Sequence, residues 1–377
     1  MKRISFIVIN LVFYITLSAQ KDSIQAKLSF NADFRFRVEQ DWNSKKSDGT
    51  FRDDRTRFRY RLRAGVEYDD KWYNIGFRIR TGNPNKQQDP QLTLGDGFKE
   101  FGTLPIGLEK AYFQGKWNTF KFWVGKNTFP FEKSNELFWS DNVYPEGIFV
   151  GKGFRINSDI INSLDIRGGH FIMSASGKSL GQDTYFQGYQ AYITFLENRF
   201  DLFPSFYLFK NVPNIPDGNE TFEIDYAILH IGTRLHLIKK PLLNIEFDYY
   251  NNLRNYNQID SITPSFKKQK SGYVIGLKCG ELKRKGDWVF EASYANLQQY
   301  SAVDFMAQND WARWDYSSFG SPDGRLTNFN GIELVTGFMI GKRASLKMKY
   351  YLVEQLIPYG ITKETGNRIR LDLDVKI

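Results

Sequence analysis

The chain has almost none of the residues that build disulfides, metal centres or catalytic clusters. It holds one cysteine, Cys279, and three histidines among 377 residues. A single cysteine excludes an internal disulfide, and no histidine stands at metal-ligand spacing from an acid or the cysteine. The HExxH pattern is absent, as is a glycine-rich phosphate loop between a strand and a helix. The sequence therefore offers no candidate catalytic residue, metal site or cofactor site, and we expect no enzyme.

Long apolar runs are also missing, apart from one near the N-terminus. Two basic residues precede an apolar run over residues 4–17, and a Ser-Ala-Gln segment follows it. This order is typical of a secretory signal peptide. The alternative is a single membrane-spanning helix, which needs about 20 apolar residues, and this run is shorter. We expect residues 1–20 to be a signal peptide and residues 21–377 to form one exported domain.

The whole chain is polar in composition but rich in aromatic residues. Mean hydropathy is -0.46, and 16% of the residues are aromatic. No later segment is long and apolar enough for a membrane helix, so a helical membrane protein does not fit. A β-barrel does, because only every second residue of its strands faces lipid and aromatic residues mark its rims. The formal charge of +9 raises nucleic-acid binding as an alternative. Export of the chain argues against that partner.

The stretch over residues 53–69, DDRTRFRYRLRAGVEYD, is the most informative part of the chain. Arginine occupies every second position from Arg57 to Arg63, and Phe58, Tyr60 and Leu62 lie between. Successive side chains of a strand point to opposite faces. A lipid-facing arginine near the bilayer midplane costs about 2–4 kcal/mol, so we expect the arginine face to border water. This pattern predicts a transmembrane β-barrel with a wet lumen.

Alternating polar and apolar residues predict sixteen strands after the signal peptide. They lie near residues 27–39, 54–68, 72–81, 106–117, 119–126, 147–156, 163–173, 184–196, 200–210, 223–237, 242–251, 271–280, 287–298, 331–340, 344–354 and 367–377. The connections between them alternate between short and long. The alternative is a soluble all-β fold, in which short and long connections are not expected to alternate along the chain. The fold we expect is an all-β, single antiparallel barrel with short periplasmic turns and long external loops.

Several sequence motifs resemble the bacterial putative-porin family. They include DRTRFRYRLRAGVEYDDKWYNIGFRIRTGNP, LEKAYFQG, VGKNTFPF, LFWSDNVYPEGI, DFMAQNDWARW and RIRLDLDVKI, which span from about Asp53 to Ile377 with gaps. The resemblance implies a barrel in the outer membrane of a Gram-negative cell, surrounded by lipid, through which small hydrophilic solutes diffuse without a cofactor. It also implies insertion by the barrel assembly machinery, with the apolar C-terminal Ile377 as part of the signal. A homotrimer and a monomer both stay open.

Side chains at alternate positions of a strand share a face, so the positions of ten arginines place them on the lumenal side of their strands. Closure of the barrel brings the last strand beside the first and joins these arginines into one wall. These candidate solute contacts are Arg35, Arg37, Arg57, Arg59, Arg61, Arg63, Arg78, Arg80, Arg368 and Arg370. An opposing acidic wall or constriction is expected from Glu132, Glu136, Asp141, Glu246 and Asp248. The first three belong to the third external loop, at about residues 127–146. Sixteen-stranded porins often fold this loop into the lumen, and the resemblance implies the same here.

Two roles are open for the arginines and two for the channel. The arginines either contact solute or brace the barrel by pairing with acids on neighbouring strands. The leading function is passive diffusion that favours small anions. The alternative is a substrate-specific channel for acidic oligosaccharides or other oligomeric anions. Trp311 and Trp314 of the seventh loop are candidates for a sugar platform, or they hold that loop together. An outer-membrane hydrolase would need a Ser/His/acid cluster, for which the sequence has no candidate.

Overall fold

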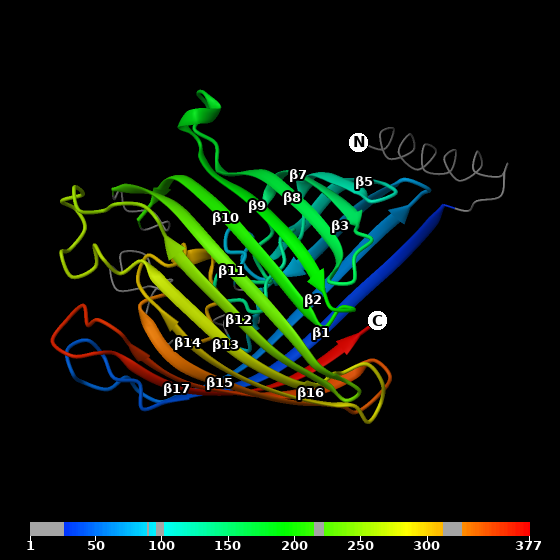
Figure 1. Cartoon of the computed structure of the whole chain (residues 1–377). Helices are drawn as coiled ribbons and strands as arrows, with labels where there is room; N and C mark the ends of the chain where they lie inside the picture. The colour runs from blue at the N-terminus through cyan, green and yellow to red at the C-terminus, as the bar shows by residue number, and fades with distance from the viewer. Residues whose placement is uncertain (1–25, 89, 96–101, 215–221, 312–325) are drawn as a thin grey trace, which may run out of the picture.

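The chain folds into a closed antiparallel β-barrel (Figure 1). The computed structural model describes residues 26–88, 90–95, 102–214, 222–311 and 326–377. The expected signal peptide at residues 1–20 lies outside these residues. Within them, no helix has the length and apolar character required to cross a bilayer.

Sixteen long strands form the wall, as predicted from the sequence. They are β1 (Lys27–Trp42), β2 (Arg55–Asp69), β3 (Tyr73–Thr81), β5 (Ile106–Trp117), β6 (Phe120–Lys126), β7 (Glu146–Arg155), β8 (Ile161–Ser174), β9 (Thr184–Phe195), β10 (Phe200–Pro213), β11 (Glu223–Lys239), β12 (Leu242–Asn252), β13 (Ser271–Gly280), β14 (Trp288–Leu297), β15 (Phe329–Met339), β16 (Ala344–Gln355) and β17 (Thr365–Lys376). A two-residue strand, β4 (Leu92–Thr93), was not predicted. It pairs with β2 beyond the end of β3.

The first and last strands close the barrel. β1 pairs with β2 on one side and with β17 on the other. The β1–β17 register places Arg35 opposite Asp374 and Arg37 opposite Asp372. The seam therefore joins oppositely charged side chains of distant segments, a pairing that favours this register over a shifted one.

Short turns gather at one end of the barrel and long loops at the other. The turns between β2 and β3, β5 and β6, and β9 and β10 each take two to four residues. In Figure 1 the start of β1 and the C-terminus lie at the short-turn end, on the right, and the long loops extend to the left. This sorting matches the expected alternation of connections.

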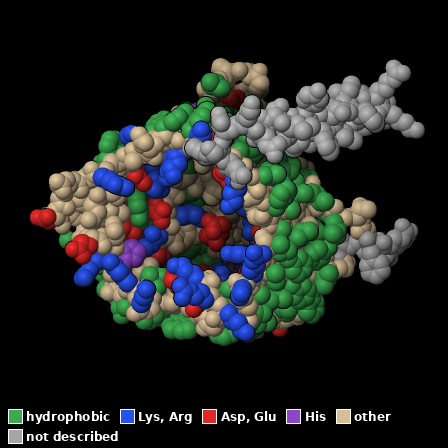
Figure 2. Space-filling view, turned by 90° about the vertical axis from the view of Figure 1, so that its right-hand side faces the viewer, with side chains coloured by type: hydrophobic (Ala, Val, Ile, Leu, Met, Phe, Trp, Pro, Cys, Tyr) green, Lys and Arg blue, Asp and Glu red, His purple; other side chains and the backbone are tan. Residues whose placement is uncertain are grey.

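The two faces of the wall differ in chemistry. Phe58 and Leu62 on β2 are 48% and 46% exposed, whereas Arg59 and Arg61 between them are 8% and 4% exposed. Figure 2, viewed toward the short-turn end, shows hydrophobic side chains on the outer wall and a hollow ringed by Lys, Arg, Asp and Glu. The outside suits hydrocarbon and the inside suits water.

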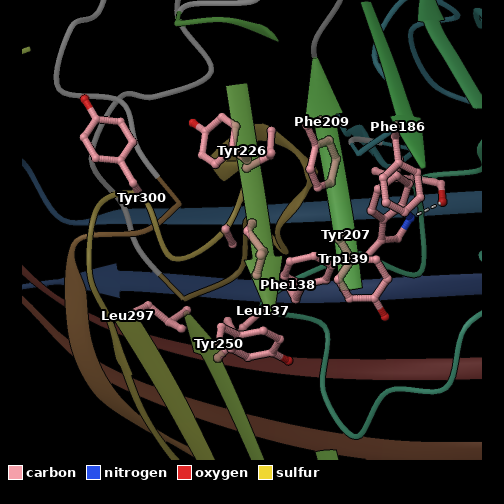
Figure 3. Close-up of a cluster of buried hydrophobic side chains, with 14 of the residues drawn as sticks. Leu137, Phe138, Trp139, Phe186, Tyr207, Phe209, Tyr226, Tyr250, Leu297 and Tyr300 are labelled. Atoms are coloured by element: carbon pink, nitrogen blue, oxygen red, sulfur yellow. Dashed lines mark hydrogen bonds between the residues drawn. The ribbon is translucent and has the colours of Figure 1, made fainter. Parts of the chain in front are cut away.

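An aromatic core fills part of the lumen (Figure 3). Inward-facing rings of β6 to β12 supply much of its wall side, among them Trp123, Phe149, Phe171, Tyr207 and Tyr250, and β13 to β16 also contribute. Both faces of these strands are rich in apolar residues, because one meets lipid and the other meets this core. The same cause explains why the predicted strand 223–237 carries apolar residues on both of its faces.

Candidate functional site

The arginines of β1, β2 and β17 form a cross-strand ladder of ion pairs. Arg35 donates through Nε to Asp374 at 2.6 Å, and Arg37 pairs in the same way with Asp372 at 2.6 Å. Arg61 and Arg63 share Asp33, at 2.7 and 2.8 Å. The remaining pairs are Arg57 with Glu39, Arg55 with Asp41 at 2.8 Å, and Arg368 with Asp41 at 2.6 Å. The ladder compensates buried charge across the closing seam, which is the bracing role considered above.

The ladder continues around the wall through Glu109 of β5. Arg78 of β3 lies 2.5 Å from this carboxylate, and Arg63 lies 3.8 Å from it. Arg80 lies 4.0 Å from the same carboxylate and also donates to main-chain oxygens, including that of Lys86 at 2.8 Å. Glu109 was not singled out from the sequence, because the register between β3 and β5 shifts at Arg78 and parity alone did not reveal the pairing.

Part of the ladder opens onto a cavity of about 240 Å³, which we call the arginine cavity. Its charged lining is Arg35, Arg37, Arg59, Arg61, Arg63, Arg370, Lys347, Lys349, Glu136, Asp141, Asp310 and Asp372. Eight of these side chains are basic and four are acidic. Strands and three loops contribute to the lining, so segments far apart in the sequence meet at this cavity.

The third loop lies inside the barrel, as the resemblance implied. Its Phe138 ring stacks between Tyr207 of β10 and Tyr250 of β12, with centroid distances of 4.8 and 5.1 Å. Trp139 stacks on Phe129 at 4.5 Å (Figure 3 labels Phe138 and Trp139 among the buried rings). These contacts fasten the loop to the wall opposite the arginines.

The same loop also reaches the arginine side. Arg78 donates to the Tyr144 hydroxyl at 2.6 Å. Glu136 and Asp141 border both the arginine cavity and a second cavity of about 420 Å³. Asp141 pairs with Lys133 at 2.6 Å within the loop. The loop therefore crosses the lumen, with its rings on one wall and its carboxylates toward the other.

The other predicted acids do not form an open acidic wall. Glu132 and Glu246 pair with Arg234 of β11, at 3.1 and 2.8 Å. Asp248 is 1% exposed and accepts a hydrogen bond from Asn135 at 2.8 Å. Asp248 faces inward, as strand alternation predicts, but the third loop packs over it and it borders neither cavity. The sequence showed the parity of this residue but not what packs over it.

A segment of the seventh loop, residues 304–311, also enters the barrel. The main-chain N–H of Gln308 donates to the main-chain oxygen of Glu136 at 2.9 Å, and this bond links the segment to the third loop. Asp310 pairs with Arg370, and its carboxylate lies 3.8 Å from Arg37. Trp311 is 3% exposed and packs on Phe329 and Tyr351, so it offers no open platform for a sugar. Trp314 lies outside the residues that the structure describes.

Sequence comparison places the chain in a family. A family model described as "Putative porin" matches residues 19–222, which is 204 of the 377 residues. The chain belongs to this family. No curated protein matches it.

Solved structures give this putative-porin family member the same barrel fold as known outer-membrane proteins. Pseudomonas putida OprB is 13% identical, with 93% of this chain and 94% of that chain covered and a TM-score of 0.55. A loop-deletion mutant of OmpT, an outer membrane protein of Vibrio cholerae, is 10% identical, with 93% and 99% covered and a TM-score of 0.51. At these identities the likeness concerns the fold.

Two lysines of this family member were missed as site residues. Lys347 and Lys349 of β16 line both cavities. Lys349 pairs with Glu333 at 3.0 Å, while Lys347 has no ion-pair partner among the described residues. Their alternation with Leu346 and Met348 is visible in the sequence. A lipid-facing lysine is as costly as a lipid-facing arginine, so the same reasoning applied to lysine predicts that both face the lumen.

Proposed function

We propose that this chain forms a water-filled outer-membrane channel that favours small anions. Family membership and the porin-like barrel support a channel, and the apolar outer wall supports a place in lipid. The observation that carries the anion preference is the lining of the arginine cavity, where eight basic side chains face four acidic ones. Excess positive charge in a narrow, low-dielectric space raises the local concentration of anions.

The transport mechanism is hydrated diffusion through an off-centre passage. The aromatic core and the third loop fill part of the lumen, and charged residues of the wall line both cavities, so solutes pass beside the charged strands. The ladder keeps the guanidinium groups fixed and mostly compensated, and the surplus cations attract the solute. Bracing and solute contact are thus shared among different side chains. Lys347 is a solute contact, because it has no ion-pair partner in the described chain and borders both cavities.

The remaining expectations form part of the same proposal. Residues 1–20 direct export and are removed, and residues 21–377 form the barrel. The barrel assembly machinery of a Gram-negative cell inserts the chain, with Ile377 in its terminal signal. The channel uses no cofactor and binds no nucleic acid. Both a homotrimer and a monomer are compatible with a passage contained within one barrel.

A salt gradient across a planar bilayer tests the proposal. The purified full chain, without its signal peptide, is added to a bilayer with tenfold more KCl on one side. A reversal potential of the sign set by chloride is expected, with stepwise conductance. A cation-type reversal potential overturns the anion preference, and the absence of conductance from a correctly folded, detergent-soluble barrel overturns the channel.

The alternative channel for acidic oligosaccharides has weaker support in this geometry. Its candidate platform, Trp311, is buried, and a segment of the seventh loop crosses the arginine cavity. Saturable current block by an oligomer such as alginate, without block by small anions, would favour this alternative.

A further inference from the structure

Asp310 lies where a dissolved anion would be expected. Its carboxylate pairs with Arg370 and lies 3.8 Å from Arg37. Arg368 adds a hydrogen bond of 2.6 Å to the main-chain oxygen of Asp310. Arg37 and Arg370 are 3% and 1% exposed, so the acid reaches a desolvated cationic site. Charge-assisted contacts of this kind are the strong ones.

The origin of Asp310 distinguishes it from its neighbours. Among the described residues, the other carboxylates that pair with arginines of β1, β2 and β17 come from strands of the wall. These wall carboxylates are fixed by the strands that carry them. Asp310 comes from a loop, and the segment before it is held by two main-chain hydrogen bonds to the third loop, Ser140 to Met306 at 2.8 Å and Gln308 to Glu136 at 2.9 Å.

The cavity beside Asp310 holds further groups that could bind an anion. Arg61 is 4% exposed, and its Nε has no hydrogen-bond partner. Lys347 borders the same space and has no ion-pair partner among the described residues. A buried donor without a partner is costly, and a ligand oxygen would remove that cost.

We propose that the arginine cavity is a saturable binding site for small dicarboxylates, and that Asp310 occupies it as an internal carboxylate that the solute displaces. This inference rests on the proposed function, since the solute reaches the cavity through the channel. One solute carboxylate takes the place of Asp310 at Arg37 and Arg370. The second is met by Arg61 and Lys347.

The class of ligand follows from the shape and charge of the site. A guanidinium group presents parallel donors that match the two oxygens of a carboxylate. The resident group is itself a carboxylate. The volume of about 240 Å³ is below the range of drug-sized sites, which suits a short-chain acid rather than an oligomer. Because Asp310 is tethered, it competes at a high local concentration and keeps the affinity for solute low.

Block of chloride current by succinate tests the inference, with Asp310→Asn as the main variant. In this variant the half-blocking succinate concentration is expected to fall about tenfold, because the internal competitor has lost its charge. Acetate and the neutral succinamide are expected to block weakly in both proteins. The matched control is Glu146→Gln, which removes one carboxylate that borders neither the arginine cavity nor the second cavity. Glu146 pairs with Lys126 at the start of β7, so the block in this control should stay near the wild-type value.

The alternative outcomes are distinct. Equal effects of the two variants would show that only net charge matters and would overturn the inference, as would an unchanged block in Asp310→Asn. If the Asp310 variant does not insert, Lys347→Gln replaces it, with an expected weakening of succinate block by several-fold. An unchanged block in that variant also overturns the inference. The proposed function fails differently, through loss of conductance or of anion preference in the wild-type channel without succinate.

Discussion

Asn135 donates a 2.8 Å hydrogen bond to Asp248, and this contact joins the third loop to the inner face of β12. The other Asp248 oxygen lies 2.8 Å from Nε2 of His230. Phe138, three residues along the loop, stacks on Tyr250 of the same strand. One buried carboxylate therefore helps to hold the segment that limits the passage.

Replacing this carboxylate should loosen the loop. Asp248→Ala leaves the buried polar groups of Asn135 and His230 without their partner, which costs about 1–3 kcal/mol. We expect a lower thermal unfolding temperature, followed by the heat-dependent shift in gel migration, and noisier open-channel current. Glu197→Ala, which changes an exposed acid in a short turn, is the control and should alter neither quantity. Open-channel current from Asp248→Ala that is no noisier than that of the wild type would show that the Asn135–Asp248 contact is not needed to hold the loop.

Neutral residues at two ladder positions should reduce the anion preference. In the Arg59→Gln, Arg61→Gln double variant the reversal potential is expected to move toward the cation value, because two of the eight basic side chains at the arginine cavity are lost. Arg155→Gln removes an exposed charge at the short-turn end and should have little effect. If selectivity does not move in the double variant, these two arginines act as braces alone.

Shortening the third loop should widen the passage. Replacing residues 132–141 by a short Gly-Ser linker removes Glu136 and the loop rings from the lumen, and single-channel conductance is expected to rise. The variant also loses the buried Phe138 and Trp139, so folding must be checked by heat-dependent gel migration. Deleting residues 177–181 is the control, since these exposed residues belong to another external loop. Conductance that stays unchanged after loop replacement would contradict a constriction at this place.

Mild acid should strengthen the anion preference. Burial raises the pKa of Glu136, the nearby Asp141 carboxylate raises it further, and Lys133 and Lys349 oppose the rise. A raised pKa means that this carboxyl binds its proton at a higher pH than an ordinary glutamate, near 4.3. As the pH falls from neutral, the loop therefore loses negative charge beside the arginine cavity before an ordinary glutamate would, and the reversal potential in a KCl gradient should shift toward chloride. The shift should be smaller in Glu136→Gln, and an equal shift in both proteins would assign it to other groups.

Strand patterning was sufficient to predict the wall of this molecule, and loops account for what it missed. The alternation around Arg57–Arg63 gave the orientation of β2, and the sixteen predicted ranges correspond to the sixteen long strands. Side chains on a strand have only two directions, so parity can be read from the sequence. Asp310 and the cover over Asp248 depend on loops that fold back across the barrel. No period in the sequence specifies such contacts.

The seam between β1 and β17 places two demands on the same side chains. Arg35 and Arg37 pair with Asp374 and Asp372 across the seam, and both arginines also line the arginine cavity. A substitution at either position therefore alters the closure of the barrel together with the charge of its interior, and only stability measured alongside conductance separates the two effects.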